Sequence, residues 1–163
     1  MIEQWDKSRE KAKELSLEQW PPEVFTVALP RRANNRREAM DCLKEIAANS
    51  PFVSLSGLPA RLSGRGFGKL VSSAAVASSF CPEAHFLAVA NIDKIYTNAI
   101  EPWKFELNPN KENDGLKARR YLYAPMKYSD KITVVKITVK EYENVRLENK
   151  LYSIEAVDVD LRA

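Results

Sequence analysis

Alternating hydrophobic and polar positions mark the last third of the chain and predict β-strands there. The pattern covers residues 103–107, 118–127, 132–140 and 151–160. A short polar turn at 128–131 separates the second run from the third, as expected for an antiparallel pair. In the last run the alternation shifts phase near Ala156 and Val157, which predicts a β-bulge. Pro125 cannot donate to a ladder, so its strand is expected to be an edge strand or to bulge there.

Upstream of these runs, apolar residues recur at helical spacing. Predicted helices cover residues 2–19, about 35–48, 70–80 and about 82–100. The inward stripe of the last helix contains Val89, Ile92, Tyr96 and Ala99. Short apolar runs at 24–28 and 52–55 are typical of strands. Helices followed by an antiparallel meander predict an α+β fold class, with N-terminal helices before a roughly four-stranded sheet that leaves one face free for a ligand.

A glycine- and serine-rich segment, 55–73, lies between the helical patterns and carries Arg61, Arg65 and Lys69 without any acidic residue. Glycines allow close backbone approach, so exposed N–H groups in such a loop could cradle a phosphate. The segment is not a P-loop, because Leu70 follows the Gly-Lys pair and the upstream glycine has the wrong spacing. The alternative is a surface loop without a ligand.

A second acid-free segment, 117–127, lies in the predicted sheet. Its strand has one apolar face, while the other carries Arg119, Tyr121, Tyr123 and Lys127. Cations and aromatic rings on one face are suited to phosphates and stacked bases. Although the net charge is only +3, the two basic segments could merge into one positive face. They could equally be separate solvated faces.

Composition limits the classes of protein. With 163 residues and 45% apolar residues, the chain is one globular domain, with 1–50 a helical extension and 51–163 the main α+β unit. It has no apolar run of about 18 residues and no signal-like start, so we expect a cytoplasmic protein without a membrane partner. Cys42 and Cys81 form no CxxC pair, and a single histidine is too few for most zinc sites. We therefore expect buried thiols, no metal and no cofactor.

The one histidine, His85, lies near the start of the last predicted helix. The partial positive charge of a helix start favours neutral imidazole, which can act as a general base. His85 could equally be a core histidine with its hydrogen bonds satisfied. A catalytic Cys81 assisted by His85 four residues later is a further alternative, which Pro82 disfavours.

Several ordered motifs carry a resemblance to a known group of domains. They are the runs 85–93 (HFLAVANID), 98–100 (NAI), 123–126 (YAPM), 134–141 (VVKITVKE) and 151–154 (LYSI). This series resembles the phage-associated nuclease-like modules of the barnase–EndoU–colicin–RelE fold group, found within very large polyvalent proteins of phages and conjugative elements. The resemblance implies a barnase/RelE-like fold and metal-independent ribonuclease activity. Its basic and hydroxyl positions fall on Lys69 and on Ser72 or Ser73, ahead of His85.

We therefore predict a toxin-like RNA endonuclease domain. Metal-independent RNA cleavage needs a base, an acid and cations on the phosphorane. The predicted catalytic residues are His85, Lys69, Ser73 and Arg120. The predicted substrate-binding residues are Arg61, Arg65, Ser72, Arg119, Tyr121, Tyr123 and Lys127. RNA is the expected partner, together with an immunity protein or a parent protein.

Two other classes remain open. The domain could be a non-catalytic module that binds RNA, or that binds a partner protein through an exposed sheet edge. It could also be a metalloenzyme that uses some of the scattered acids Asp93, Glu101, Asp114, Asp158 and Asp160.

Overall fold

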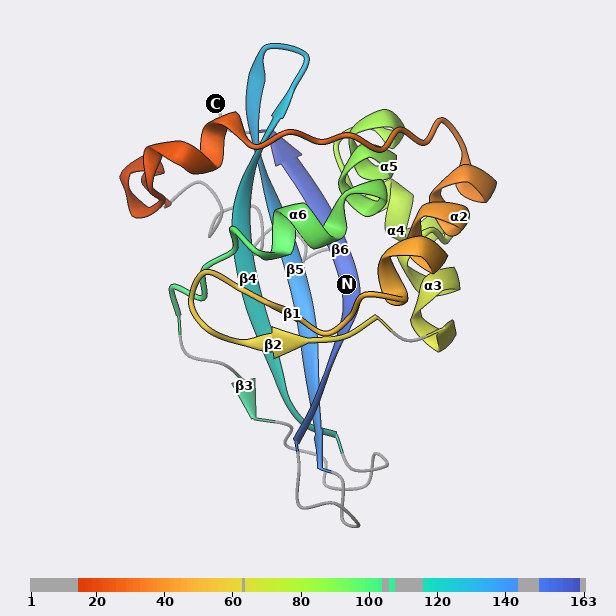
Figure 1. Cartoon of the computed structure of the whole chain (residues 1–163), viewed down its shortest axis with the longest axis vertical. Helices are drawn as coiled ribbons and strands as arrows, with labels where there is room; N and C mark the ends of the chain where they lie inside the picture. The colour runs from red at the N-terminus through yellow and green to blue at the C-terminus, as the bar shows by residue number, and fades with distance from the viewer. Residues whose placement is uncertain (1–14, 63, 104–105, 108–115, 144–149, 162–163) are drawn as a thin grey trace.

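The computed structural model describes residues 15–62, 64–103, 106–107, 116–143 and 150–161 (Figure 1). The chain is α+β, as predicted, with helices first and the long strands last. The helices are η1 (Leu17–Gln19), η2 (Pro22–Thr26), α2 (Arg36–Ala47), α3 (Gly64–Leu70), α4 (Ser73–Ser78), α5 (Pro82–Ala90) and α6 (Ile92–Tyr96), of which η1 and η2 are 3-10 helices. The strands are β1 (Phe52–Val53), β2 (Pro59–Ala60), β3 (Glu106–Leu107), β4 (Leu116–Tyr128), β5 (Lys131–Glu143) and β6 (Lys150–Leu161).

The strands belong to two separate antiparallel sheets. The larger one contains the four strands that the sequence predicts over 103–160, and the smaller one is additional to the single sheet expected. β1 pairs with β2 through Phe52 and Ala60, and the other sheet has the order β3-β4-β5-β6. β1 lies within the run 52–55 that predicted a strand, whereas β2 was not predicted, because two residues are too few to display an alternation. Gly57, with φ +92°, lies in the connection between β1 and β2, where a residue with a side chain would be strained.

A tight hairpin joins the two longest strands. Ser129 and Asp130 both have positive φ, 46° and 64°, which is the backbone of a two-residue type I′ turn. Tyr128 and Lys131 flank the turn and pair with each other, and this fixes the register of β4 on β5. The predicted bulge in β6 is confirmed within a residue, because the pairing steps from Ala156 to Ile154 and skips residue 155.

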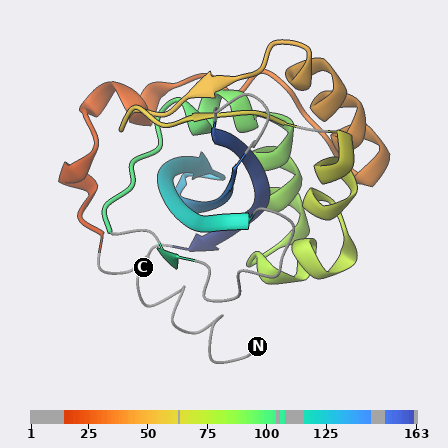
Figure 2. The ribbon, with the colours of Figure 1, turned by 90° about the horizontal axis from the view of Figure 1, so that it is seen from below.

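Helices α5 and α6 cover one face of the large sheet (Figures 1 and 2). The predicted single helix over 82–100 is wrong, because Asn91 leaves the helical conformation (φ −123°, ψ 29°) and divides it. The inward stripe predicted within residues 82–100 is confirmed as buried. One buried cluster contains Val89, Ile92, Tyr96, Leu122, Val135 and Ile137, together with Ala39, Leu43 and Ile46 of α2.

The opposite face of the sheet is covered too, so the expectation of a face free for a ligand is wrong over the middle of β4. Leu15, Trp20 and Val24 form a second buried cluster with Tyr123 and Val134. The indole Nε1 of Trp20 donates to the carbonyl of Tyr123 at 3.2 Å, which fixes the N-terminal segment on the sheet. This segment contains 3-10 helix η2 where a strand was predicted over 24–28, and the predicted helix over 2–19 falls mostly outside the described residues.

The glycine-rich segment is helical rather than looped. Residues Gly64–Leu70 form α3, whose Phe67 and Leu70 are buried in the first cluster. The N–H groups inside a helix bond to the preceding turn, so this stretch does not form the phosphate-binding loop that its composition suggests. Among the described residues, no helix has the length and apolar character needed to cross a bilayer.

Candidate functional site

His85 lies in the interior and not at a cleft. Its side chain is 0% exposed, with Nδ1 2.8 Å from the Ser79 hydroxyl and Nε2 2.7 Å from the Leu70 carbonyl. A carbonyl only accepts, so Nε2 carries the proton and Nδ1 accepts from Ser79. The same hydroxyl accepts from the backbone N–H of Val159 at 2.8 Å. His85 is therefore the core histidine with satisfied hydrogen bonds that the sequence left as an alternative, and its ring joins α5 to α3 and β6.

The predicted hydroxyl and lysine positions lie near the junction of α3 and α4. Lys69 is exposed in the last turn of α3. Ser72 caps α4, since its hydroxyl accepts from Ala75 N at 3.1 Å and donates to the Lys69 carbonyl at 3.1 Å. Ser73, the first residue of α4, is exposed.

The predicted cations of β4 do not share a surface. Arg119 and Arg120 are consecutive in a regular strand, so their side chains leave the sheet on opposite faces. Arg120 is also engaged by Glu101, with Nε 2.8 Å from Oε2 and Nη2 2.6 Å from Oε1. Arg119 and Arg120 therefore do not contribute to one positive face, which was one of the two arrangements that the sequence left open.

The predicted base-stacking rings are also occupied by the protein itself. Tyr123 is 1% exposed and meets Trp103 edge-to-face at 5.3 Å between ring centroids. The Tyr121 ring lies 4.5 Å from Nζ of Lys136, a cation–π contact. Arg61 and Lys127 are exposed, whereas the Arg65 side chain lies outside the described residues.

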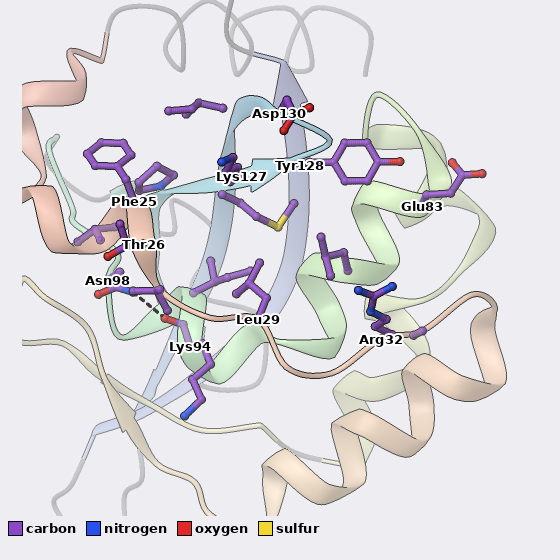
Figure 3. Close-up of a pocket in the computed structure, with 18 of the residues that line it drawn as sticks. Phe25, Thr26, Leu29, Arg32, Glu83, Lys94, Asn98, Lys127, Tyr128 and Asp130 are labelled. Carbon is purple, nitrogen blue, oxygen red and sulfur yellow. Dashed lines mark hydrogen bonds between the residues drawn. The ribbon is translucent and has the colours of Figure 1, made fainter.

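A groove of about 870 Å³ lies elsewhere, between η2, the segment that follows it, α5, α6 and the β4–β5 hairpin (Figure 3). Much of its wall is apolar, contributed by Phe25, Val27, Leu29, Leu87, Ile95, Pro125, Met126 and Ile132. Of the predicted site residues only Lys127 lines it.

The groove runs along the free edge of β4. Four consecutive residues of β4, Pro125 to Tyr128, line it, although alternate side chains of a strand point to opposite faces. A cavity can touch both faces only beside an edge, and β5 occupies the other edge. Ile100 pairs with Tyr123 on this side through bonds of 2.8 and 2.9 Å, and the open part begins beyond that bridge.

Charged side chains surround the groove. Lys94 is exposed at its η2 and α6 end, where Phe25, Thr26 and Asn98 also lie, and Lys127 is exposed near Asp130 and Tyr128 (Figure 3). Arg32 and Glu83 are exposed at the opposite end, near Tyr128.

Tyr128 forms the end of the groove nearest the start of α5. Its ring packs edge-to-face on Phe80, with centroids 5.8 Å apart. A hydrogen bond with the Cys81 side chain and, to a smaller extent, burial raise the pKa of the Tyr128 phenol above its ordinary value. The phenol therefore keeps its proton to higher pH than a free tyrosine would.

Asn91 holds one wall of the groove in place. Its Oδ1 accepts from Arg31 N at 3.0 Å, while Nδ2 donates to the carbonyl of Arg31 at 2.8 Å and to that of Leu87 at 3.0 Å. The Arg31 guanidinium reaches Asp93 at 2.8 Å. The helix break at Asn91 thus ties the extended segment after η2 to α5 and α6. Sequence reasoning missed this role, for which the only signal was an asparagine inside an apolar helix.

The acids considered as metal ligands are dispersed. Asp93 is paired with Arg31 and Glu101 with Arg120, while Asp114 and the side chains of Asp158 and Asp160 lie outside the described residues. In the part of the chain that the structure describes, no three His, Cys, Asp or Glu side chains gather as a metal site would require.

The structure is therefore an α+β domain with a groove at a sheet edge. Comparison with known families gives the family: the chain matches "Large polyvalent protein-associated domain 3" over residues 30–152 and belongs to that family. No curated protein matches the chain. No solved structure matches it either.

Proposed function

We propose that this domain is a non-catalytic protein-binding module of a larger polyvalent protein, and that the groove beside β4 is its binding site. The observation that carries the proposal is an apolar groove at an open strand edge, two features by which domains take up peptide segments. Membership of a polyvalent-protein family supports a parent chain as the context of this binding.

Under this proposal, the domain resembles the nuclease fold group through common ancestry and does not share its activity. A ribonuclease at neutral pH depends on accessible acid and base groups, and imidazole is the side chain best suited to both. The only imidazole here is enclosed and occupied at both nitrogens. Cleavage of RNA would have to proceed through exposed groups such as Lys69 and Ser73, with the phosphate held by cations that lie on different faces. A domain that keeps the fold of a nuclease and lacks ribonuclease activity fits this arrangement of residues better.

A display library of random eight-residue peptides tests the proposal. Immobilised full-length protein should enrich clones whose binding is lost in Val27→Asp, because Val27 is 36% exposed in the groove and a charge there opposes apolar contact. Val53→Asp is the matched control, since Val53 is 54% exposed on β1, outside the groove. Enriched clones that bind both variants equally, or no enrichment, would overturn the assignment of the groove.

An RNA assay distinguishes a protein-binding module from a ribonuclease. The full chain, incubated with a fluorescent RNA pool and a chelator, should leave the RNA intact. If the RNA is cleaved, and if cleavage is lost in Lys69→Ala or Ser73→Ala, the domain is a ribonuclease and the proposal is wrong.

A further inference from the structure

We infer that the groove binds an extended acidic peptide, which adds to the large sheet as a new strand along Pro125–Lys127 of β4. This inference rests on the proposed function and names the chemistry of the partner. Three observations carry it: the direction of the backbone groups at this edge, the wall beside them and the charges around them.

The backbone of β4 presents hydrogen-bonding groups to the groove. The N–H and C=O of Tyr123 point away from β5, since both bond to Ile100. These directions alternate along an antiparallel strand, so Pro125 and Lys127 point the same way as Tyr123. Neither has an outward hydrogen bond recorded within the described residues. The Lys127 N–H and the carbonyls of Pro125 and Lys127 are therefore available to an incoming strand.

Pro125 limits how this edge can be used. A proline has no N–H, and prolines at sheet edges oppose indiscriminate pairing with other strands. An added strand is therefore bonded at Lys127 in both directions and at Pro125 through the carbonyl alone. Such an edge favours a short peptide segment over a long β-ribbon.

The walls supply contacts for both sides of an added strand. Side chains of an extended peptide alternate between two faces. Met126 and Leu87 lie on the α5 side of β4, and Pro125 and Ile132 lie on the other. Apolar peptide residues thus find apolar surface next to the pairing edge.

The charges around the pairing edge select the sign of the peptide. Three cations line the groove: Lys127 on the edge itself, Lys94 on α6 and Arg32 on the segment after η2 (Figure 3). The carboxylates of Glu83 and Asp130 lie toward the turn and the start of α5. The three cations outnumber the two carboxylates, so a peptide that carries aspartate or glutamate is favoured over a basic one.

Binding can be measured with synthetic eight-residue peptides of alternating valine and aspartate, or of valine and lysine, titrated into the ¹⁵N-labelled full chain. We expect the acidic peptide to shift the amide resonances of Lys127 and Met126 and to slow hydrogen exchange of the Lys127 amide. The basic peptide should bind at least about 10-fold more weakly. Lys127→Glu should weaken binding of the acidic peptide, and Lys131→Glu, at an exposed lysine outside the groove, should not.

Methylated peptides identify strand addition. The amides of alternate residues face opposite edges of a strand, so methylating all valine amides or all aspartate amides blocks one edge only. One of these two peptides should lose about 10-fold or more in affinity. If neither loses affinity, or if Lys127 exchange is unchanged on binding, strand addition is wrong while the groove remains a binding site. If, in addition, the display library yields no groove-dependent clone, the proposed function fails as well.

Discussion

Arg120 and Glu101 form a two-pronged ion pair, with the guanidinium donating at 2.8 Å and 2.6 Å to the two carboxylate oxygens. The side chains are only 21% and 12% exposed, so each charge depends on the other for solvation. A cation held in this way fixes the chain after α6 to β4 and is a poor candidate for a mobile phosphate ligand.

Removal of either partner should therefore destabilise the fold. We expect Arg120→Met and Glu101→Gln each to lower the free energy of unfolding by about 1.5–3 kcal/mol, because the remaining group loses charged hydrogen bonds. The double variant should cost less than the sum of the two, which urea unfolding of all four proteins would measure. Additive losses would mean that the pair contributes no coupling.

His85 should matter for stability. His85→Ala removes hydrogen bonds to Ser79 and Leu70 and leaves a cavity in the core, so we expect a loss of about 2–4 kcal/mol in the free energy of unfolding. Ser73→Ala, at an exposed position, should change it by less than about 0.5 kcal/mol. Equal stability of His85→Ala and the wild type would contradict the structural role.

The phenol of Tyr128 should make stability depend on alkaline pH. Its pKa is raised in the folded state, mainly by the hydrogen bond with Cys81, so the protonated phenol favours folding. This contribution is complete below the unfolded pKa of about 10 and is lost as pH rises through the higher folded value. Tyr128→Phe should remove that part of the alkaline decline in unfolding free energy. In Cys81→Ala, an ultraviolet titration should find the phenol pKa closer to its ordinary value.

Asn91 should control the wall of the groove. Asn91→Ala leaves the part-buried backbone groups of Arg31 without these partners, so we expect a loss of about 1–3 kcal/mol in stability and faster hydrogen exchange at Arg31. Asn98→Ala is the matched control, because the side-chain bond recorded for Asn98 reaches only the Lys94 carbonyl, within its own turn. If the Arg31 amide exchanges its hydrogen at similar rates in both variants, Asn91 does not hold this segment against α5 and α6.

The long strands were predictable because their signal is local. In β5, Val135, Ile137 and Val139 recur with the period of two that a half-buried strand requires. The break at Asn91 was not, since one asparagine in an apolar helix costs little by propensity and its partner lies 60 residues away. The helical α3 was hidden by its glycines, whose low helix propensity is overridden by the burial of Phe67 and Leu70.

The candidate site was harder to predict than the fold. His85 was a candidate because imidazole is a common catalytic group. Its actual role depends on hydrogen bonds with the Leu70 carbonyl and the Ser79 hydroxyl, which no pattern of side chains in the sequence reveals. The groove forms where the hairpin meets a segment about a hundred residues earlier, as the 103-residue separation of Trp20 and Tyr123 illustrates for the neighbouring cluster. Only Lys127 carried a local signal, as an exposed cation beside an edge proline.

The contact of Trp20 with Tyr123 means that the folded domain extends beyond the stretch that it shares with its family. The family match begins at residue 30 and ends at 152, yet Trp20 lies before it and Ile154, Val157 and Val159 of the main core lie after it. A fragment trimmed to residues 30–152 would expose Tyr123 and Val134 on one face of the sheet. It would also lose the part of β6 that follows residue 152. For this chain, a fragment cut at the ends of the family match should therefore unfold more readily than one that keeps the flanking residues on both sides.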